Sequence, residues 1–388
     1  MARVSPLGNL HEMNQASIFT IGAEGPTPCP IDIVAMHESI ELEYAALRRR
    51  SGLMDRPDRA VLRVTGDDKL DFLNSMLTQE LKDLPASGAT RSFWLNRKGR
   101  VDADLLVVVQ EDCVLLECHT LCAQRARETL ESYVIADDVE IEDVSERSHR
   151  LSMHGPDTLA RVGSIVSVSL ATLAPDRATT VSIEGVDVTL VRQDTLGACG
   201  LEMLVPVEGV ERVWGALLEH EGEGFAPVRA VGWHAWNIAR VESGIAEYLI
   251  DFSSDSLPHE TGVIEDRVSF TKGCYLGQEV VARMDARGVW KRQLRALRCT
   301  RSASDIPEGQ PLQPVTGERV CAHGTDDAIG GVTSSVASPM LGDVAICFAM
   351  LERGAVEAGE LVDISAQGTT MEAIVQEGLV FVEATSAS

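Results

Sequence analysis

The sequence predicts an α+β fold followed by a small all-β domain. Up to about residue 290, strand-like and helix-like segments alternate at short spacing. Hairpin patterns such as residues 90–109 and 179–193 favour mixed or antiparallel sheets over a doubly wound parallel sheet. After Lys291 the apolar segments become short, and Pro and Gly separate them roughly every 8–15 residues. This spacing is typical of a small β-barrel or sandwich.

The 388 residues allow two or three domains. We expect residues 1–30 to form a flexible N-terminal arm, because they mix Pro, Gly and polar residues without periodicity. Residues 31–290 are expected to form a core of two α+β subdomains, since the pattern restarts after Arg150. Residues 291–388 are expected to form the C-terminal β-barrel domain.

The composition excludes several classes of function. With 34 basic and 59 acidic residues, the net charge is −25, which repels nucleic acid and anionic membranes in general. The longest aliphatic run, Leu105–Val109, is too short to span a bilayer, and residues 1–10 lack the apolar stretch of a signal peptide. Nine scattered cysteines without a C-x-x-C pair favour a reducing compartment, so we expect a cytoplasmic protein.

The most informative segment is "FTKGCYLGQEVVARMDARGVWKR", residues 270–292. Gly273 and Gly277 bracket a Cys-Tyr pair and allow the backbone to approach a ligand closely. Lys272 lies two residues from Cys274, and a nearby cation stabilises a thiolate. Cys274 is therefore the candidate reactive thiol.

Positive charge is concentrated around this segment. Residues 267–301 contain nine basic and two acidic residues, a local sum of +7, so the rest of the chain carries −32. Such an island suits a compact polyanionic ligand or one focal contact with RNA. The alternative, which we favour for the arginines downstream, is pairing with the surplus carboxylates.

These motifs resemble those of the YgfZ family, folate-binding relatives of the aminomethyltransferase (T-protein) of the glycine cleavage system. The segment K-G-C-Y-L-G-Q-E followed by V-A-R-x-x-x-R-G carries the resemblance. Residues 43–55, 64–81, 95–107 and 239–244 are also similar, and "GGVTSS" with "SPMLGDVAICF" resembles the C-terminal barrel of that superfamily. The resemblance implies a T-protein-like fold with a tetrahydrofolate site in its core.

The resemblance also implies roles for single residues. Asp104 matches an aspartate near the folate nitrogens, Glu202 matches a glutamate that holds the pterin, and Arg240 matches a superfamily arginine. A carboxylate such as that of Glu202 can accept two parallel N–H groups from a pterin edge. Trp236 is a candidate stacking residue, with a role in the core as the alternative. The segment around Cys274 adds further expected contacts at Lys272, Tyr275, Gln278 and Arg283.

Departures from the aminomethyltransferase pattern favour a thiol-bearing folate protein. The chain has Ala235-Trp236-Asn237 where those enzymes usually read A-R-D, and Arg91 where they often place a tyrosine. We therefore expect a protein that binds tetrahydrofolate or a derivative and supports iron–sulfur cluster assembly or repair, with iron–sulfur apoproteins as partners, tRNA-modifying enzymes among them. Cys274 is the catalytic candidate for that function. A folate-dependent aminomethyl or methyl transferase is the alternative, with Asp104 as the catalytic candidate near the nitrogen that receives the one-carbon unit. A non-catalytic scaffold is a third interpretation.

No metal site is expected from the sequence. Cys113, Cys118, His119 and Cys122 lie close together, but zinc ligands usually come in tighter pairs, so burial is the favoured interpretation. Phosphate-loop, dinucleotide-binding and H-E-x-x-H motifs do not occur.

Overall fold

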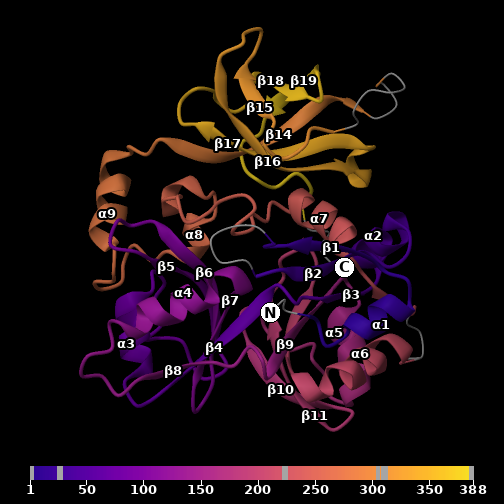
Figure 1. Ribbon diagram of the computed structural model, residues 1–388, viewed down its shortest axis with the longest axis vertical. Helices are drawn as coiled ribbons and strands as arrows, with labels where there is room; N and C mark the ends of the chain where they lie inside the picture. The colour runs from indigo at the N-terminus through magenta and orange to yellow at the C-terminus, as the bar shows by residue number, and fades with distance from the viewer. Residues whose placement is uncertain (1–3, 24–28, 221–225, 303–305, 307–312, 384–388) are drawn as a thin grey trace. The chain divides into compact units, whose positions relative to one another are not determined.

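The computed structural model describes residues 4–23, 29–220, 226–302, 306 and 313–383 (Figure 1). These residues form two compact units. Unit 1 comprises the described parts of residues 4–94 and 103–236, and unit 2 comprises those of residues 95–102 and 237–383. Each unit is described by itself below.

Unit 1 contains two larger sheets. The first has six strands in the order β10-β11-β12-β9-β3-β13, antiparallel except for the parallel pair β13–β3. Its strands are β3 (Gly52–Asp55), β9 (Ser148–His154), β10 (Ala178–Ile183), β11 (Val186–Arg192), β12 (Gly200–Pro206) and β13 (Arg229–Ala230). The hairpin expected over residues 179–193 is the pair β10–β11.

The second sheet has five strands in the order β5-β6-β7-β4-β8. Its strands are β4 (Arg59–Thr65), β5 (Ala89–Leu95), β6 (Val101–Val109), β7 (Val114–His119) and β8 (Glu140–Asp143). The hairpin expected over residues 90–109 is the neighbouring pair β5 and β6. Besides the N-terminal helix described below, unit 1 contains the helices α2 (Ile40–Arg49), α3 (Lys69–Met76), α4 (Thr120–Glu131), α5 (Thr158–Val166), α6 (Val210–Glu219) and the short η1 (Val207–Gly209).

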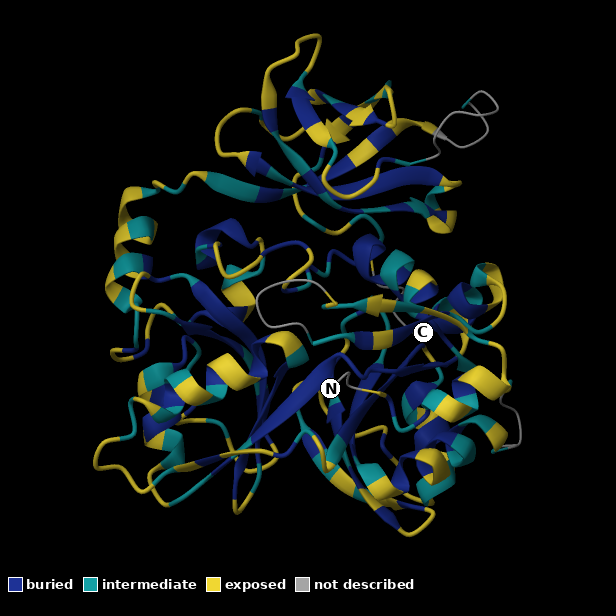
Figure 2. Cartoon of the chain, in the orientation of Figure 1, coloured by how far each residue is buried: buried dark blue, intermediate teal, exposed yellow. Residues whose placement is uncertain are grey.

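Alternating side chains divide each strand of unit 1 between two layers. On β12, Leu201 and Met203 join a core with residues of α5 and α6, whereas Leu204 joins a second core. That second core also contains Val61 of β4 and Leu106 of β6, so it lies between the two sheets. The central strands are buried along most of their length (Figure 2). Residues on the inner faces of the two sheets therefore share one enclosed interior.

The described part of residues 1–30 contains a helix and a strand, contrary to the flexible arm expected there. Helix α1 (Gly8–Met13) is followed by β1 (Ser17–Ile21), which pairs antiparallel with β2 (Ile31–Met36). Leu7 and His11 are buried, and His11 Nε2 lies 2.8 Å from Asp55 Oδ2. Residues 1–3 and 24–28 lie outside the described residues. Contacts with residues distant in the sequence hold this segment, and local periodicity does not show them.

Unit 2 combines helices, a β-turn and a barrel. Its helices are α7 (Trp233–Glu242, from Asn237 onward), α8 (Ile264–Arg267), α9 (Gln278–Arg287) and the short η2 (Pro258–Glu260) and η4 (Pro339–Leu341). The turn at residues 96–99, which joins β5 to β6, also belongs to this unit. The side chain of Tyr248 donates to the main-chain oxygen of Asp102 at 3.0 Å and so ties this turn region to the loop after α7.

The barrel is closed by six strands in the order β14-β17-β16-β15-β18-β19 (Figure 1). They are β14 (Arg292–Ser302), β15 (Arg319–Ala322), β16 (Ala328–Ser338), β17 (Val344–Glu352), β18 (Leu361–Ala366) and β19 (Thr369–Val375). Leu297, Cys347, Val362 and Ile364 are among the side chains that fill its interior. The expected all-β domain is thus a closed barrel, whose closure leaves no free sheet edge. Within the described residues, no helix is both long and apolar enough to cross a membrane.

Candidate functional site

One end of the interior between the two sheets of unit 1 is ionic. Each charged residue there lies two positions from an apolar core residue on the same strand, and so faces the same interior. The pairs are Arg59 with Val61, Asp104 with Leu106, Glu117 with Leu115, and Glu202 with Leu204. The apolar side chains pack at one end of the interior, and the charged side chains lie at the other end.

Three of these buried charges, together with Arg150, form an alternating chain that links the two sheets. Arg59 of β4 and Arg150 of β9 both donate to the carboxylate of Glu117 on β7. Arg150 also donates through Nε to Glu202 Oε2 of β12, at 2.9 Å. Since every charge has an opposite neighbour, the cost of burying each of them is offset. Removing the central Arg150 would leave two carboxylates short of a partner.

The carboxylate of Glu202 is held ionised by this arrangement. Burial acts to raise its pKa, but Arg150, His154 and Ser152 outweigh burial and hold the pKa well below its usual value. Arg150 and Ser152 both bond to Oε2, whereas the contact of Oε1 within the described part of the chain is one of 3.4 Å with His154 Nε2. A carboxylate on the polar face of a strand is usually solvated, but Glu202 is only 3% exposed.

Asp104 lies on β6 and faces the same interior as Glu202. The side chains of Asp104, Leu106 and Val108 share one face of the strand, and the latter two join the inter-sheet core. Asp104 is 8% exposed, slightly more open than Glu202. The two acids singled out in the sequence, 98 residues apart, are therefore both at the ionic end of unit 1.

Trp236 is buried against an arginine. Arg56, in the connection between β3 and β4, places its guanidinium 4.7 Å from the ring centroid of Trp236 and pairs with Asp58 at 2.8 Å. Trp233 lies on α7 with its ring centroid 5.3 Å from that of Trp236. Trp236 Nε1 is buried and has no hydrogen-bond partner among the described residues. An N–H group in this state is available to a ligand acceptor.

Arg240, on the part of α7 in unit 2, is fully buried and bonded to protein groups. Its guanidinium donates to Asp251 at 2.7 Å, to Ser334 of β16 at 2.6 Å and to Asn237 at 2.8 Å. These bonds tie α7 and the following loop to the barrel. Direct contact between Arg240 and a folate stays a prediction, and the observed bonds give this residue a structural role in any case.

Cys274 is the exposed cysteine of the chain. All nine cysteines lie in the described residues; Cys29 and Cys199 are half-buried, and the remaining six are buried. Burial raises the pKa of thiols such as Cys299, to about 12, and so keeps them protonated and unreactive. Accessibility therefore distinguishes Cys274 as the candidate thiol.

Two buried side chains flank the exposed Cys274. Lys272 and Tyr275 are 8% and 7% exposed, and Lys272 Nζ lies 5.5 Å from the centroid of the tyrosine ring. Burial raises the pKa of Tyr275 to about 12, so its hydroxyl stays protonated at neutral pH. Gln278 begins α9 and its amide donates to the main-chain oxygen of Gly273 at 3.4 Å. The loop therefore exposes the thiol of Cys274, while the side chains of Lys272 and Tyr275 are buried and anchor the loop.

Two glycines allow this loop to contact the turn between β5 and β6. Gly277 has a φ of 84°, and a Cβ there would lie 3.1 Å from the main-chain oxygen of Asn96. Gly99 has a φ of 70°, and a Cβ there would lie 2.7 Å from the side chain of Val280. Glycine is required at both places by conformation and by space.

The basic residues near Cys274 are only partly paired. Arg292 lies 3.4 Å from Glu260, as expected for pairing with surplus carboxylates. Arg283 and Arg287 on α9 are exposed and form no ion pair with any residue that the structure describes. The expected pairing therefore holds for Arg292 and not for Arg283 and Arg287.

Sequence reasoning missed the basic partners of the predicted acids. Arg59, Arg150 and Arg56 complete the ionic end of unit 1, but they lie 52 to 146 residues from Glu202 along the chain. The available signal was a charged residue within an otherwise apolar strand, as in Glu117 of "CVLLECH". Cys113, Cys118, His119 and Cys122 are all buried, and Cys122 Sγ donates to the main-chain oxygen of His119 at 3.0 Å.

Comparison with known proteins places the chain in a family. The family model described as the GCVT N-terminal domain matches residues 8–272. The model described as the glycine cleavage T-protein C-terminal barrel domain matches residues 292–382. The chain belongs to the glycine cleavage T-protein family. Residues 273–291, which include Cys274 and α9, lie outside both matches.

Relatives of this chain named as aminomethyltransferases share about a quarter of its residues. The chain is similar to the aminomethyltransferase of Staphylococcus carnosus, with 26% identity over 83% of this chain and 84% of the relative. It is equally similar to that of Caldanaerobacter subterraneus, with 26% identity over 87% of each chain. The crystal structure of the glycine cleavage system aminomethyltransferase T from Bartonella henselae has a TM-score of 0.84 over 99% of both chains at 19% identity. This likeness confirms the predicted T-protein fold class with its C-terminal barrel.

Proposed function

We propose that this protein binds tetrahydrofolate or a derivative and supports the assembly or repair of iron–sulfur proteins through Cys274, as a YgfZ-type member of the T-protein family. One observation carries the proposal: the cysteine of the K-G-C-Y-L-G-Q-E motif is exposed, whereas the other eight are buried or half-buried. It also lies between the two family matches, in a segment that they leave uncovered.

The ionic end of unit 1 supplies groups suited to a reduced pterin. A pterin edge presents parallel N–H donors, and a buried ionised carboxylate is a strong acceptor for them. Glu202 is ionised, and its Oε2 receives bonds from Arg150 and Ser152, whereas among the described residues Oε1 has a longer contact, 3.4 Å, with His154 Nε2. Asp104 faces the same interior. The buried Nε1–H of Trp236 has no hydrogen-bond acceptor among the described residues and can donate to a ligand. We assign these three residues to folate binding, and Arg240 to positioning α7.

Cys274 would act transiently in this function. Iron–sulfur clusters are generally held by four protein ligands, so one cysteine does not retain a cluster alone. An exposed thiolate can instead serve as a partial ligand, thiol donor or redox group during transfer to an apoprotein. The partners on this proposal are iron–sulfur apoproteins, tRNA-modifying enzymes among them.

Complementation tests the thiol role. Cells that lack this protein would be supplied with the wild type, Cys274→Ala or the matched control Cys199→Ala, whose thiol is half-buried. The readout is the activity of iron–sulfur enzymes, including tRNA modification. We expect Cys274→Ala to fold normally and fail to restore activity, while Cys199→Ala restores it. Full restoration by Cys274→Ala would refute the thiol role.

A folate-dependent aminomethyl or methyl transferase is the alternative, favoured by the names of the relatives, which are aminomethyltransferases. On this alternative Asp104 would orient or protonate the nitrogen that receives the one-carbon unit. Incubation with tetrahydrofolate and candidate methylated amines, followed by detection of methylene- or methyl-folate, separates the two functions. Turnover that Asp104→Asn abolishes would support the transferase; tight folate binding without turnover supports the first proposal. If neither Cys274 nor Asp104 affects any phenotype, the protein is a binding scaffold.

A further inference from the structure

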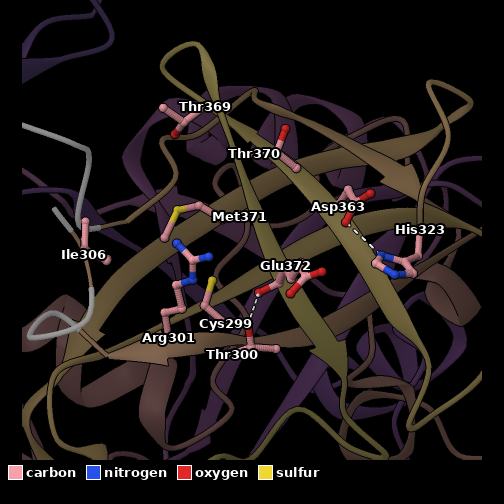
Figure 3. A pocket seen from close by; sticks show the side chains of 10 residues that line it. All are labelled: Cys299, Thr300, Arg301, Ile306, His323, Asp363, Thr369, Thr370, Met371 and Glu372. Atoms are coloured by element: carbon pink, nitrogen blue, oxygen red, sulfur yellow. Dashed lines mark hydrogen bonds and ion pairs between the residues drawn. The ribbon is translucent and has the colours of Figure 1, made fainter.

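Three side chains of metal-binding type meet on the outside of the barrel, in unit 2. They are His323, in the loop after β15, Asp363 of β18 and Glu372 of β19. One ligand atom from each lies within 4.8 Å of the ligand atoms of the other two. Figure 3 shows the three side chains on the same side of a pocket, with Arg301 and Met371 opposite. Among the residues that the structure describes, these three are the His, Cys, Asp or Glu side chains that lie close enough together to hold one metal ion.

The strand register forces the two carboxylates together. Asp363 and Glu372 are direct cross-strand partners in the antiparallel pair β18–β19, so their side chains project from the same face. Like charges directly opposite each other destabilise a sheet. Neither carboxylate has a Lys or Arg partner among the described residues. Asp363 instead pairs with His323. A cation bound between them would relieve the repulsion.

The loop after β15 fixes the orientation of Asp363. His323 Nδ1 lies 3.0 Å from Asp363 Oδ1, and the main-chain N–H of Gly324 donates to Oδ2 at 2.8 Å. Gly324 has a φ of 72°, a conformation in which glycine is favoured. Because the same loop carries His323 and holds Asp363, the imidazole and the carboxylate are set beside each other before any ion arrives.

An open cavity adjoins the three side chains. Its volume is about 300 Å³, and its lining includes Thr300, Arg301 and Met371 besides the three candidate ligands. The hydroxyl of Thr300 donates to the main-chain oxygen of Glu372 at 3.3 Å, which joins β14 to β19 at this place. A metal ion held on one side of this cavity would keep coordination positions open toward it, as metal sites that bind an exchangeable ligand do.

We propose that His323, Asp363 and Glu372 form a site for a divalent first-row transition metal of the zinc type. One imidazole nitrogen and two carboxylate oxygens suit Zn²⁺ better than Mg²⁺ or Ca²⁺, which prefer oxygen ligands alone. On binding, the ion takes the place of the proton that His323 shares with Asp363, and that proton leaves to solvent. Zinc–ligand bonds are about 2.0–2.2 Å long. Rotation about side-chain bonds would bring the three ligand atoms to this distance from the ion.

Calorimetric titration with zinc chloride tests this site. The protein would carry Cys274→Ser, which removes the exposed thiol as a competing ligand, and would first be freed of metal with a chelator. We expect one Zn²⁺ per chain, with His323→Ala and Glu372→Gln each weakening binding by more than about tenfold. The matched controls are His234→Ala and Glu377→Gln, which remove an exposed histidine and an exposed carboxylate outside the cluster and should bind as the parent does. Thermal melting of each variant checks that the barrel is folded.

Two results would overturn the inference. The first is an affinity for Zn²⁺ that His323→Ala and Glu372→Gln leave unchanged, or that the control substitutions reduce by as much. The second is equal affinity for Zn²⁺ and Ca²⁺, because a pair of carboxylates alone would then explain binding without the imidazole. These results would not bear on the role of Cys274, since the parent protein in this experiment already lacks that thiol.

Discussion

Gly277 lies against Gly99: a Cβ added to Gly277 would come within 3.4 Å of the Gly99 Cα. This contact joins the loop that carries Cys274 to the turn between β5 and β6. Both glycines have positive φ, 84° and 70°, so neither position accepts a side chain without strain. The shape of the thiol loop therefore depends on a turn some 180 residues earlier in the sequence.

Substitution of Gly277 should loosen this contact. We expect Gly277→Ala to lower the free energy of unfolding by about 1–2 kcal/mol, because alanine is strained in the left-handed region and its Cβ meets the turn. Gly273→Ala is the matched control in the same loop, since a Cβ there has nothing within 4 Å. Urea denaturation of both variants checks this prediction. Equal stability of the two variants would contradict the proposed contact.

The alternating chain of charges should depend on its central arginine. We expect Arg150→Met to destabilise the protein by about 3–5 kcal/mol, because it leaves buried Glu117 and Glu202 short of a counter-charge. Arg147→Met provides the comparison: its pair with Glu142 is solvent-exposed and worth about 1 kcal/mol or less. Chemical denaturation measures both. A loss for Arg150→Met as small as that for Arg147→Met would show that the chain contributes little.

His37 should make stability depend on pH. Burial first, and then the nearby His11, lower its pKa from 6.5 to about 4, against the opposing effect of Asp55. Between these values the unfolded chain binds a proton that the folded protein does not, so stability is full above pH 6.5 and falls as the pH drops toward 4. The loss amounts to about 3 kcal/mol.

The variant His37→Gln isolates this effect. Unfolding free energies of the wild type and the variant would be measured by urea denaturation at about pH 7 and about pH 5. We expect the wild type to lose more stability than the variant over this interval. Parallel losses would show that His37 titrates alike in the folded and unfolded states.

Exposure of Cys274 predicts selective alkylation. Under native conditions iodoacetamide should modify Cys274 first, because thiols such as Cys347 are buried and burial raises their pKa. Peptide mass spectrometry after short exposure identifies the modified residue, and Cys274→Ser should abolish the rapid phase. Rapid modification of a buried cysteine instead would mean that accessibility does not distinguish Cys274.

Local patterns were sufficient for much of the fold. The hairpin of β5 and β6 follows from alternating residues on either side of an Asn-Arg-Lys-Gly turn, and the barrel follows from short strands between Pro and Gly. The motif around Cys274 also identified the exposed thiol from sequence. Each of these features is written in neighbouring residues, which is why sequence reasoning reached it.

Features made by distant residues escaped prediction. Leu7 is buried in an apolar core with Leu53 and Leu151, and His11 pairs with Asp55, so distant residues give the N-terminal segment an order that its own sequence does not show. Burial of Glu202 depends on Arg150, which comes from another strand. The cluster of His323 with Asp363 and Glu372 has no short motif, because a strand register brings its members together.

Titration of the protein with tetrahydrofolate tests the account most directly. By calorimetry we expect one molecule to bind per chain, and Glu202→Gln to bind about 10- to 100-fold more weakly, since it loses a charged acceptor but keeps its shape. Glu377→Gln, an exposed substitution in the segment after β19, should bind as the wild type does. Failure of the folded wild-type protein to bind tetrahydrofolate, or equal affinity of Glu202→Gln and the wild type, would contradict the proposed folate site.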